Sequence, residues 1–181
     1  MGRMRIAVWL DEMRAALDLE RDADVPCGSC TACCTSSQFV HIDADETDAL
    51  AHIPPQLLFP APRAPRGTML LGYDDEGRCP MLGEHGCSIY EHRPRTCRTY
   101  DCRVFAATGI EPDSTQPAIA ERVRQWVFES VDERDAAARD ALAAAAAFTR
   151  GRTNPTEHAV AAVRRAVEAL SSTPRPDEAA E

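Results

Sequence analysis

The chain has 181 residues, a net charge of −9 at neutral pH and 44% apolar residues, 30 of which are alanine. Valine, isoleucine, leucine and phenylalanine together number only 32, so large side chains for a core are scarce and another source of stability is expected. The acidic balance disfavours general nucleic-acid binding, and no apolar stretch approaches the length of a membrane span.

The first predicted element is an amphipathic helix over residues 4–20. Its apolar residues recur at steps of three and four, which is the spacing of one helix face: Ile6, Trp9, Leu10, Met13 and Leu17. A short helix is predicted over residues 43–51, with Asp43 as the cap residue and Glu46 at the third position.

The middle of the chain reads as loops and short strands. Five prolines between residues 52 and 67 predict an extended loop. Residues 68–73 suit a strand, and acidic and glycine residues at 74–77 and 83–86 predict two turns. A short helix is expected to begin near Arg93 and Pro94.

The last third of the sequence predicts helices. Helical spacing of apolar residues runs from Pro117, a first-turn proline, to Gly151. A second helix is predicted from Asn154, a cap residue followed by Pro155 and Glu157, to about Leu170. The polar tail over 171–181 is expected to be disordered.

All eight cysteines lie between residues 27 and 102, which divides the chain into three parts. Residues 1–110 are interpreted as an N-terminal helix plus a cysteine-rich domain, 111–170 as a helical segment and 171–181 as the tail. The cysteines follow the pattern C-x2-C-x2-C-C and then four more distant positions. They are Cys27, Cys30, Cys33, Cys34, Cys79, Cys87, Cys97 and Cys102.

This cysteine pattern indicates a metal site. A two-residue spacer lets two sulfurs face one point, and thiolates are soft ligands that suit zinc or an iron–sulfur cluster. Because neighbouring side chains usually point apart, Cys33 and Cys34 either serve different centres or only one of them binds metal. All eight cysteines are therefore candidate ligands of zinc or iron. The fold class predicted is mainly α, with the terminal helices packed around an irregular, metal-stabilised middle.

In two alternatives the cysteines have only a structural role. One is a framework of four disulfides. The N-terminal sequence does not read as an export signal, so a cytoplasmic location is expected. Thiols are kept reduced there, which disfavours disulfides. The other is a closed zinc knot that only stabilises the fold.

Other residues near the cysteines have possible supporting roles. Five arginines are candidates for hydrogen bonds to anionic sulfur, and the alternative is that they are solvated surface charges. They are Arg78, Arg93, Arg95, Arg98 and Arg103. His85 and His92 flank cysteines and are candidates for a fourth ligand, with exposed turn positions the more ordinary interpretation.

The motifs resemble the YkgJ family of cysteine-cluster proteins, whose pattern the flagellin lysine N-methylase group shares. After C-x2-C-x2-C-C the resemblance continues through Cys79-Pro80, Cys87 with Ile89 and Tyr90, and Arg93-Pro94-x-x-Cys97-Arg98. Many members continue with an aromatic residue and a proline, where this chain has Thr99-Tyr100-Asp101-Cys102, so Cys102 fits the pattern less well. The resemblance implies zinc or iron chelation.

Three functions follow as hypotheses. The first is a metal-binding protein that holds structural or stored zinc or iron, with the metal ion as its partner, no membrane association and a protein partner left open. The second is an iron–sulfur redox protein or a lysine N-methylase-like enzyme, although no nucleotide or cofactor loop is present. The third is a cysteine redox sensor, in which a thiolate beside Arg95 or Arg98 is oxidised.

Overall fold

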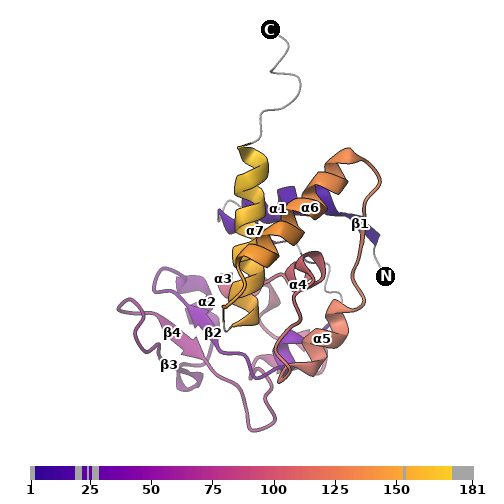
Figure 1. Ribbon diagram of the computed structural model, residues 1–181. Coiled ribbons are helices and arrows are strands. Elements are labelled where there is room, and N and C mark those ends of the chain that lie inside the picture. The colour runs from indigo at the N-terminus through magenta and orange to yellow at the C-terminus, as the bar shows by residue number, and fades with distance from the viewer. Residues whose placement is uncertain (1–2, 19–21, 24, 26–28, 153, 173–181) are drawn as a thin grey trace. The chain divides into compact units, whose positions relative to one another are not determined.

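The computed structural model describes residues 3–18, 22–23, 25, 29–152 and 154–172 (Figure 1). The chain forms two compact units. The helical unit contains residues 1–21, 101–114 and 120–181, and the cysteine-rich unit contains residues 22–100 and 115–119. The helical unit is therefore built from sequence on both sides of the cysteine-rich unit.

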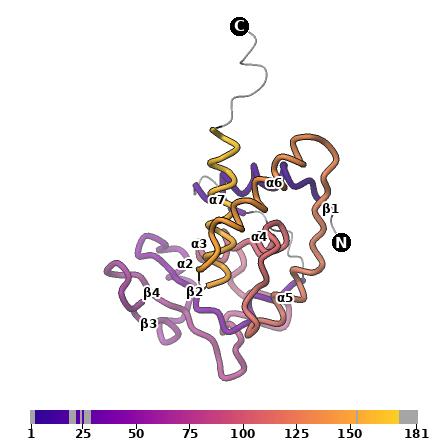
Figure 2. Tube along the Cα trace, viewed as in Figure 1, coloured from indigo at the N-terminus to yellow at the C-terminus, as the bar shows by residue number. Residues whose placement is uncertain are grey.

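Four helices and a pair of strands form the helical unit. The helices are α1 (Ile6–Leu17), α4 (Arg103–Thr108), α6 (Glu133–Phe148) and α7 (Pro155–Ser171). Strand β1 (Arg3–Arg5) pairs in parallel with β7 (Val127–Glu129), and the two run side by side in the trace of Figure 2. The predicted N-terminal helix is confirmed, except that its first residues form β1.

The core of the helical unit depends on alanine. Helices α6 and α7 lie against one another (Figure 1) and bury the small residues Ala138, Ala145, Ala159, Ala162 and Ala166 beside Leu142 and Val163. Small side chains let helix axes approach closely, so contact is dense although few large residues are available. Helix α1 adds Ile6, Trp9, Leu10 and Met13. The shortage of large side chains therefore does not leave this unit without an interior.

The prediction of a continuous helix from Pro117 to Gly151 is wrong in its middle. Helix α5 (Pro117–Val123) ends early, β7 follows, and α6 begins only at Glu133. Val127 and Phe128 are strand-forming residue types, and pairing with β1 satisfies their backbone. The Asp132 side chain then caps α6 by accepting from the Asp135 N–H at 2.9 Å.

The cap predicted at Asn154 is confirmed. The Asn154 side-chain oxygen accepts from the N–H groups of Thr156 at 2.9 Å and Glu157 at 3.2 Å, with Pro155 in the first turn of α7. The tail from residue 173 on, predicted to be disordered, lies outside the described residues. None of the helices in the described ranges has the length and apolar character needed to cross a bilayer.

The cysteine-rich unit contains a three-stranded antiparallel sheet and a two-stranded hairpin. The sheet has the order β2 (Val40–Ile42), β4 (Met69–Leu71), β3 (Leu58–Pro60), and the hairpin pairs β5 (Leu82–Gly83) with β6 (Gly86–Cys87). The short helices are α2 (Thr47–His52) and α3 (Arg95–Thr99), with 3-10 turns η1 (Cys33–Thr35), η2 (Pro55–Leu57) and η3 (Tyr90–His92).

Two predictions for this unit need correction. The predicted loop at 52–67 contains η2 and β3, because Leu58–Pro60 pairs with the confirmed strand β4. The helix predicted from residue 43 begins at Thr47, since Glu46 turns its carboxylate back to the N–H of Asp43 at 2.9 Å and closes a turn there. Both predicted turns are present, and α3 follows Pro94 as expected.

A small apolar core supports the cysteine-rich unit. It contains Val40, Ile42, Ala49, Ile53, Leu71, Met81 and Ile89. Cys79 and Cys87 pack against this cluster, so two of the candidate ligands are anchored on the core rather than carried by exposed loops.

Candidate metal centre

Seven of the eight cysteines lie in the described part of the chain, and Cys27 lies outside it. Six of the seven belong to the cysteine-rich unit: Cys30, Cys33, Cys34, Cys79, Cys87 and Cys97. Cys102 belongs to the helical unit. None of the seven described cysteines forms a disulfide, which excludes the four-bridge framework for them.

A backbone contact connects the two cysteine-bearing stretches. The Cys79 N–H donates to the Cys34 carbonyl at 2.7 Å, and the Ser37 N–H donates to the Gly77 carbonyl at 2.9 Å. Gly77 adopts a left-handed φ of +76°, as a glycine can, and closes the turn that precedes Cys79. The C-x2-C-x2-C-C segment is thereby fixed beside a residue 45 positions further along the chain.

Cys87 is held by the β5–β6 hairpin. It lies opposite Leu82 in the ladder, and the backbone N–H and the hydroxyl of Ser88 both donate to the Met81 carbonyl, at 2.8 and 3.0 Å. The turn at Cys79 is closed by the Leu82 N–H, which donates to the Cys79 carbonyl at 2.9 Å. One compact turn and hairpin therefore position two sulfurs.

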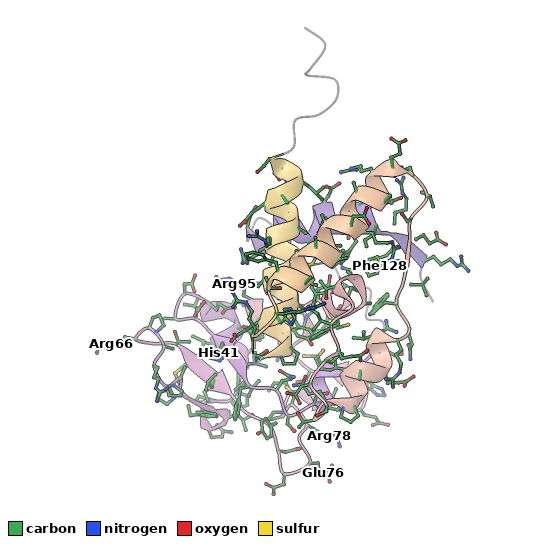
Figure 3. All side chains as sticks on the ribbon, viewed as in Figure 1. His41, Arg66, Glu76, Arg78, Arg95 and Phe128 are labelled. Atoms are coloured by element: carbon green, nitrogen blue, oxygen red, sulfur yellow. The ribbon has the colours of Figure 1, made fainter. Side chains whose placement is uncertain are left out.

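Cys97 is carried by α3, which is attached to the sheet. The Thr96 hydroxyl donates to the His41 carbonyl of β2 at 2.6 Å. The Arg95 guanidinium donates to Asp43 at 3.2 Å and to Asp45 at 3.0 Å, and the Arg95 N–H donates to Glu46. Arg95 and His41 lie near each other in Figure 3.

Five thiols influence one another electrostatically, although in the described part of the chain no three cysteine sulfurs lie within 4.8 Å of one another. Cys34 is affected by the charges of Cys79, Cys97 and Cys87, and Cys97 is affected by Cys79, Cys33 and Cys87. These residues, Cys33, Cys34, Cys79, Cys87 and Cys97, are called the five-cysteine cluster below. They come from η1, the turn at residue 79, β6 and α3.

Three members of the cluster, Cys33, Cys79 and Cys97, have a raised pKa and favour the neutral thiol. The Cys33 thiol hydrogen-bonds to Cys34, which raises the pKa of Cys33 and lowers the pKa of Cys34. Surrounding protein atoms raise the pKa of Cys97 to about 12, with contributions from Cys79, Cys33 and Cys87, although its side chain still touches solvent. Several mutually repelling thiolates in one place are the donor set that a thiophilic cation stabilises.

The nearby arginines mostly pair with carboxylates. Arg78 pairs with Glu76 at 3.6 Å on the turn after β4, where both are labelled in Figure 3. Arg98 pairs with Asp22 at 3.5 Å, and Arg95 pairs with Asp43 and Asp45. Of the five arginines predicted to offset sulfur charge, these three therefore make ion pairs with acidic side chains.

Arg93 and Arg103 have different surroundings. Arg93 lies over the Tyr90 ring at 3.6 Å, and its charge favours the thiolate form of Cys97, which lowers the pKa of that thiol. Arg103 is buried in the helical unit and pairs with the buried Asp101 at 2.8 Å. Arg93 thus acts electrostatically on the Cys97 thiol of the cluster.

Cys102 sits among the aromatic residues of the helical unit. The indole N–H of Trp126 donates to the Cys102 sulfur at 3.3 Å, and the indole N–H of Trp9 donates to Asp101 at 3.0 Å. Helix α4, which begins at Arg103, is anchored by these contacts. The Trp126 contact thus places the half-buried Cys102 against the packed interior at the start of α4.

Neither candidate histidine makes a described contact with a cysteine. His85 is exposed in the hairpin turn, and His92 on η3 directs its Nδ1 to the Asp48 carboxylate at 2.9 Å. In the described part of the chain, the three side chains whose ligand atoms lie within 4.8 Å of one another are Asp48, His52 and His92. Sequence reasoning missed Asp48 and His52, because the helix was predicted to end at residue 51, one residue before His52; in α2 the two are four residues apart on one face.

Comparisons with known proteins agree with the thiol chemistry. A model of the CxxCxxCC family, described as "Putative zinc- or iron-chelating domain", matches residues 26–117. This range includes all eight cysteines. Searches of curated proteins and of solved structures give no significant match.

Proposed function

Because the chain belongs to the CxxCxxCC family, we propose that it binds zinc or iron through cysteine thiolates of its cysteine-rich unit. The observation that carries this proposal is the backbone hydrogen bond between Cys79 and Cys34, which holds the C-x2-C-x2-C-C segment beside the core-packed Cys79 and Cys87. The five-cysteine cluster comes from four separate elements. The raised pKa values of Cys33, Cys79 and Cys97 make these thiols costly to ionise in the absence of a cation. A bound cation stabilises the thiolate forms and connects the four elements.

The proposed ligands are drawn from the cluster together with Cys27 and Cys30. Cys30 is half-buried and lies one C-x2-C spacing before Cys33, the spacing that lets two sulfurs face one point. Cys102 is left out of this set, because its sulfur accepts the Trp126 N–H inside the helical unit. We further propose a cytoplasmic location, where thiols stay reduced and available to metal.

A second candidate is an iron–sulfur protein that transfers electrons. Its support is the number of sulfurs, since a closed zinc site needs only four thiolates and the cluster alone supplies five. The chain's own residues would hold such a group on the small apolar core through Cys79 and Cys87.

Anaerobic purification followed by metal analysis and an absorption spectrum tests both candidates. A colourless protein with stoichiometric zinc supports a zinc centre. A brown protein that absorbs near roughly 400 nm supports thiolate-bound iron–sulfur. Protein that retains neither metal, and binds neither when reconstituted under reducing conditions, contradicts the proposal.

Serine variants test the ligand set. Cys30→Ser, Cys87→Ser and Cys97→Ser should each lower metal content and loosen the cysteine-rich unit, because serine is a poor ligand for a thiophilic metal. Cys102→Ser is the matched control and should keep the wild-type metal content. Equal loss in all four variants, or in none of them, would overturn the assignment of ligands.

A further inference from the structure

A second group of possible metal ligands lies on the cysteine-rich unit and contains no cysteine. Asp48 and His52 are four residues apart on α2, so both project from the same face of that helix. His92 comes from η3. Their ligand atoms all lie within 4.8 Å of one another.

The distances in this group are close to those between ligands of a small divalent cation. The Asp48 Oδ2 lies 2.9 Å from the His92 Nδ1, and the Asp48 Oδ1 lies 3.6 Å from the His52 Nδ1. With metal–ligand bonds of about 2.0–2.2 Å, neighbouring ligands of a tetrahedral zinc ion are about 3.3–3.6 Å apart. The first separation is shorter than that range and the second lies at its upper limit, so the three side chains need to rearrange but not to travel far.

Hydrogen bonds to Asp48 already hold the three residues together. The His52 Nδ1–H donates to the Asp48 carbonyl at 2.8 Å, since a carbonyl oxygen can only accept, and the His92 Nδ1 pairs with the Asp48 carboxylate. The hydrogen bond from His92 lowers the pKa of Asp48, so the group combines one stable negative charge with two imidazoles. Two imidazoles and one carboxylate form a donor set that zinc and similar cations accept.

We propose that Asp48, His52 and His92 form a second divalent-cation site, suited to Zn²⁺, that is separate from the cysteine centre. The ligand atoms are the two Nδ1 nitrogens and an Asp48 carboxylate oxygen, and water from the exposed side completes the coordination. Coordination through Nδ1 moves each ring proton to Nε2. The two hydrogen bonds to Asp48 are then replaced by bonds to the cation.

Metal binding requires the two histidine rings to separate, and this movement can be detected. The His52 and His92 rings are stacked, with centroids 3.5 Å apart and planes within 5° of parallel. A metal lies close to the plane of each imidazole that binds it, so the rings must turn out of the stack. Both side chains are about 40% exposed, which leaves room for rotation about χ2.

The test follows the histidine rings directly. Zn²⁺ is titrated into the full chain labelled with ¹⁵N-histidine, after the cysteine centre has been loaded. The ring resonances of His52 and His92 should move together and saturate at one further equivalent. Those of His41 and His85, exposed histidines of the same unit, should stay in place.

Variants separate a built site from adventitious binding. Asp48→Asn keeps the side-chain shape and should weaken this Zn²⁺ binding by at least roughly 10–100-fold, the loss seen when even a group that only orients a metal ligand is removed. His52→Gln should abolish the further equivalent, whereas His85→Gln should leave it intact. The amide spectrum of each variant verifies that α2 is still folded.

Two outcomes would overturn the second site. One is an equal response of His41, His85, His52 and His92 to Zn²⁺, and the other is unchanged affinity in folded Asp48→Asn. Metal held by the thiolates is measured separately in the same samples. Failure here is therefore distinct from failure of the proposed cysteine centre.

Discussion

Asp135 is the buried acidic residue that joins the start of the helical unit to α6. Its side chain is fully buried and accepts from the N–H groups of Val131 at 3.0 Å and Ala7 at 3.1 Å, and from the Arg5 guanidinium at 2.9 Å. Burial alone raises the pKa of this carboxyl. The hydrogen bonds and the charge of Arg5 outweigh burial and lower the pKa of Asp135 to about 2.

This shift predicts acid sensitivity of the helical unit. The unfolded chain takes up the Asp135 proton at the ordinary pKa of 3.8, whereas the native chain does so only near about 2. The stabilisation is therefore complete above the higher value and is lost as the pH falls between the two. Thermal unfolding followed by tryptophan fluorescence at several pH values measures this loss.

Substitution of Asp135 isolates its contribution. At neutral pH, Asp135→Asn should lower the melting temperature by roughly 4–10 °C, because an amide NH₂ then faces donors and Arg5 keeps only Asp132 as a carboxylate partner. The variant should also show a flatter acid profile than the wild type. Asp140→Asn, at an exposed position of α6, should change neither property. Parallel acid profiles for wild type and Asp135→Asn would refute this role.

At the scale of elements, the turn at Gly77 determines how the two cysteine-bearing stretches meet. Gly77 has a φ of +76°, and an added Cβ there would collide with the Ser37 hydroxyl oxygen. Ser37 itself adopts a φ of +52°. The contact between Cys34 and Cys79 thus depends on two left-handed residues placed against each other.

Gly77→Ala should destabilise the cysteine-rich unit by about 1–2 kcal/mol, the cost of a left-handed φ for a residue with a Cβ. Metal affinity should fall with it, because Cys79 follows this turn directly. Gly109→Ala is the matched control, since Gly109 has a φ of +68° but no atom near its Cβ position and lies in the helical unit. Loss of metal affinity in both variants would show that the turn has no special role.

The same scale shows what local sequence can predict. Helices α1 and α7 could be predicted, because apolar spacing and the Asn154 cap act within a few residues. Strands β3 and β7 could not, because each is stabilised by a partner distant in sequence: Leu58–Pro60 by β4, and Val127–Glu129 by β1. Helical periodicity persists through Trp126 and Val127 and so conceals the break.

For the whole molecule, the two units carry separate spectroscopic reporters. Both tryptophans, Trp9 and Trp126, belong to the helical unit, and all three tyrosines belong to the cysteine-rich unit. The helical unit has its own core of packed alanines, whereas the cysteine-rich unit has only a small apolar cluster. Removal of metal should therefore affect the two units unequally.

Chelation under reducing conditions should loosen the cysteine-rich unit and leave the helical unit folded. Hydrogen exchange should accelerate at β5, β6 and α3, while amides of α6 and α7 stay protected. Tryptophan emission should change little. Equal acceleration in both units would mean that the metal stabilises the chain as a single cooperative whole.

The candidate site could be predicted in its chemistry but not in its membership. Spacing alone identified the thiols, because C-x2-C geometry is local. The family pattern set Cys102 apart, but its indole partner 24 residues away could not be predicted, nor could the contact of His92 with Asp48, 44 residues away. Those relations depend on how the chain folds back on itself.

The discontinuous make-up of the helical unit has a consequence for biosynthesis. The ribosome releases α1 first, then the whole cysteine-bearing stretch, and only afterwards α6 and α7, against which α1 buries its apolar face. The apolar face of nascent α1 therefore stays exposed while more than a hundred residues are translated. At about 5–20 residues per second this takes several seconds or more. The cysteine-rich stretch can therefore bind metal before the core of the helical unit is complete. During the same interval, chaperones can bind the exposed face of α1.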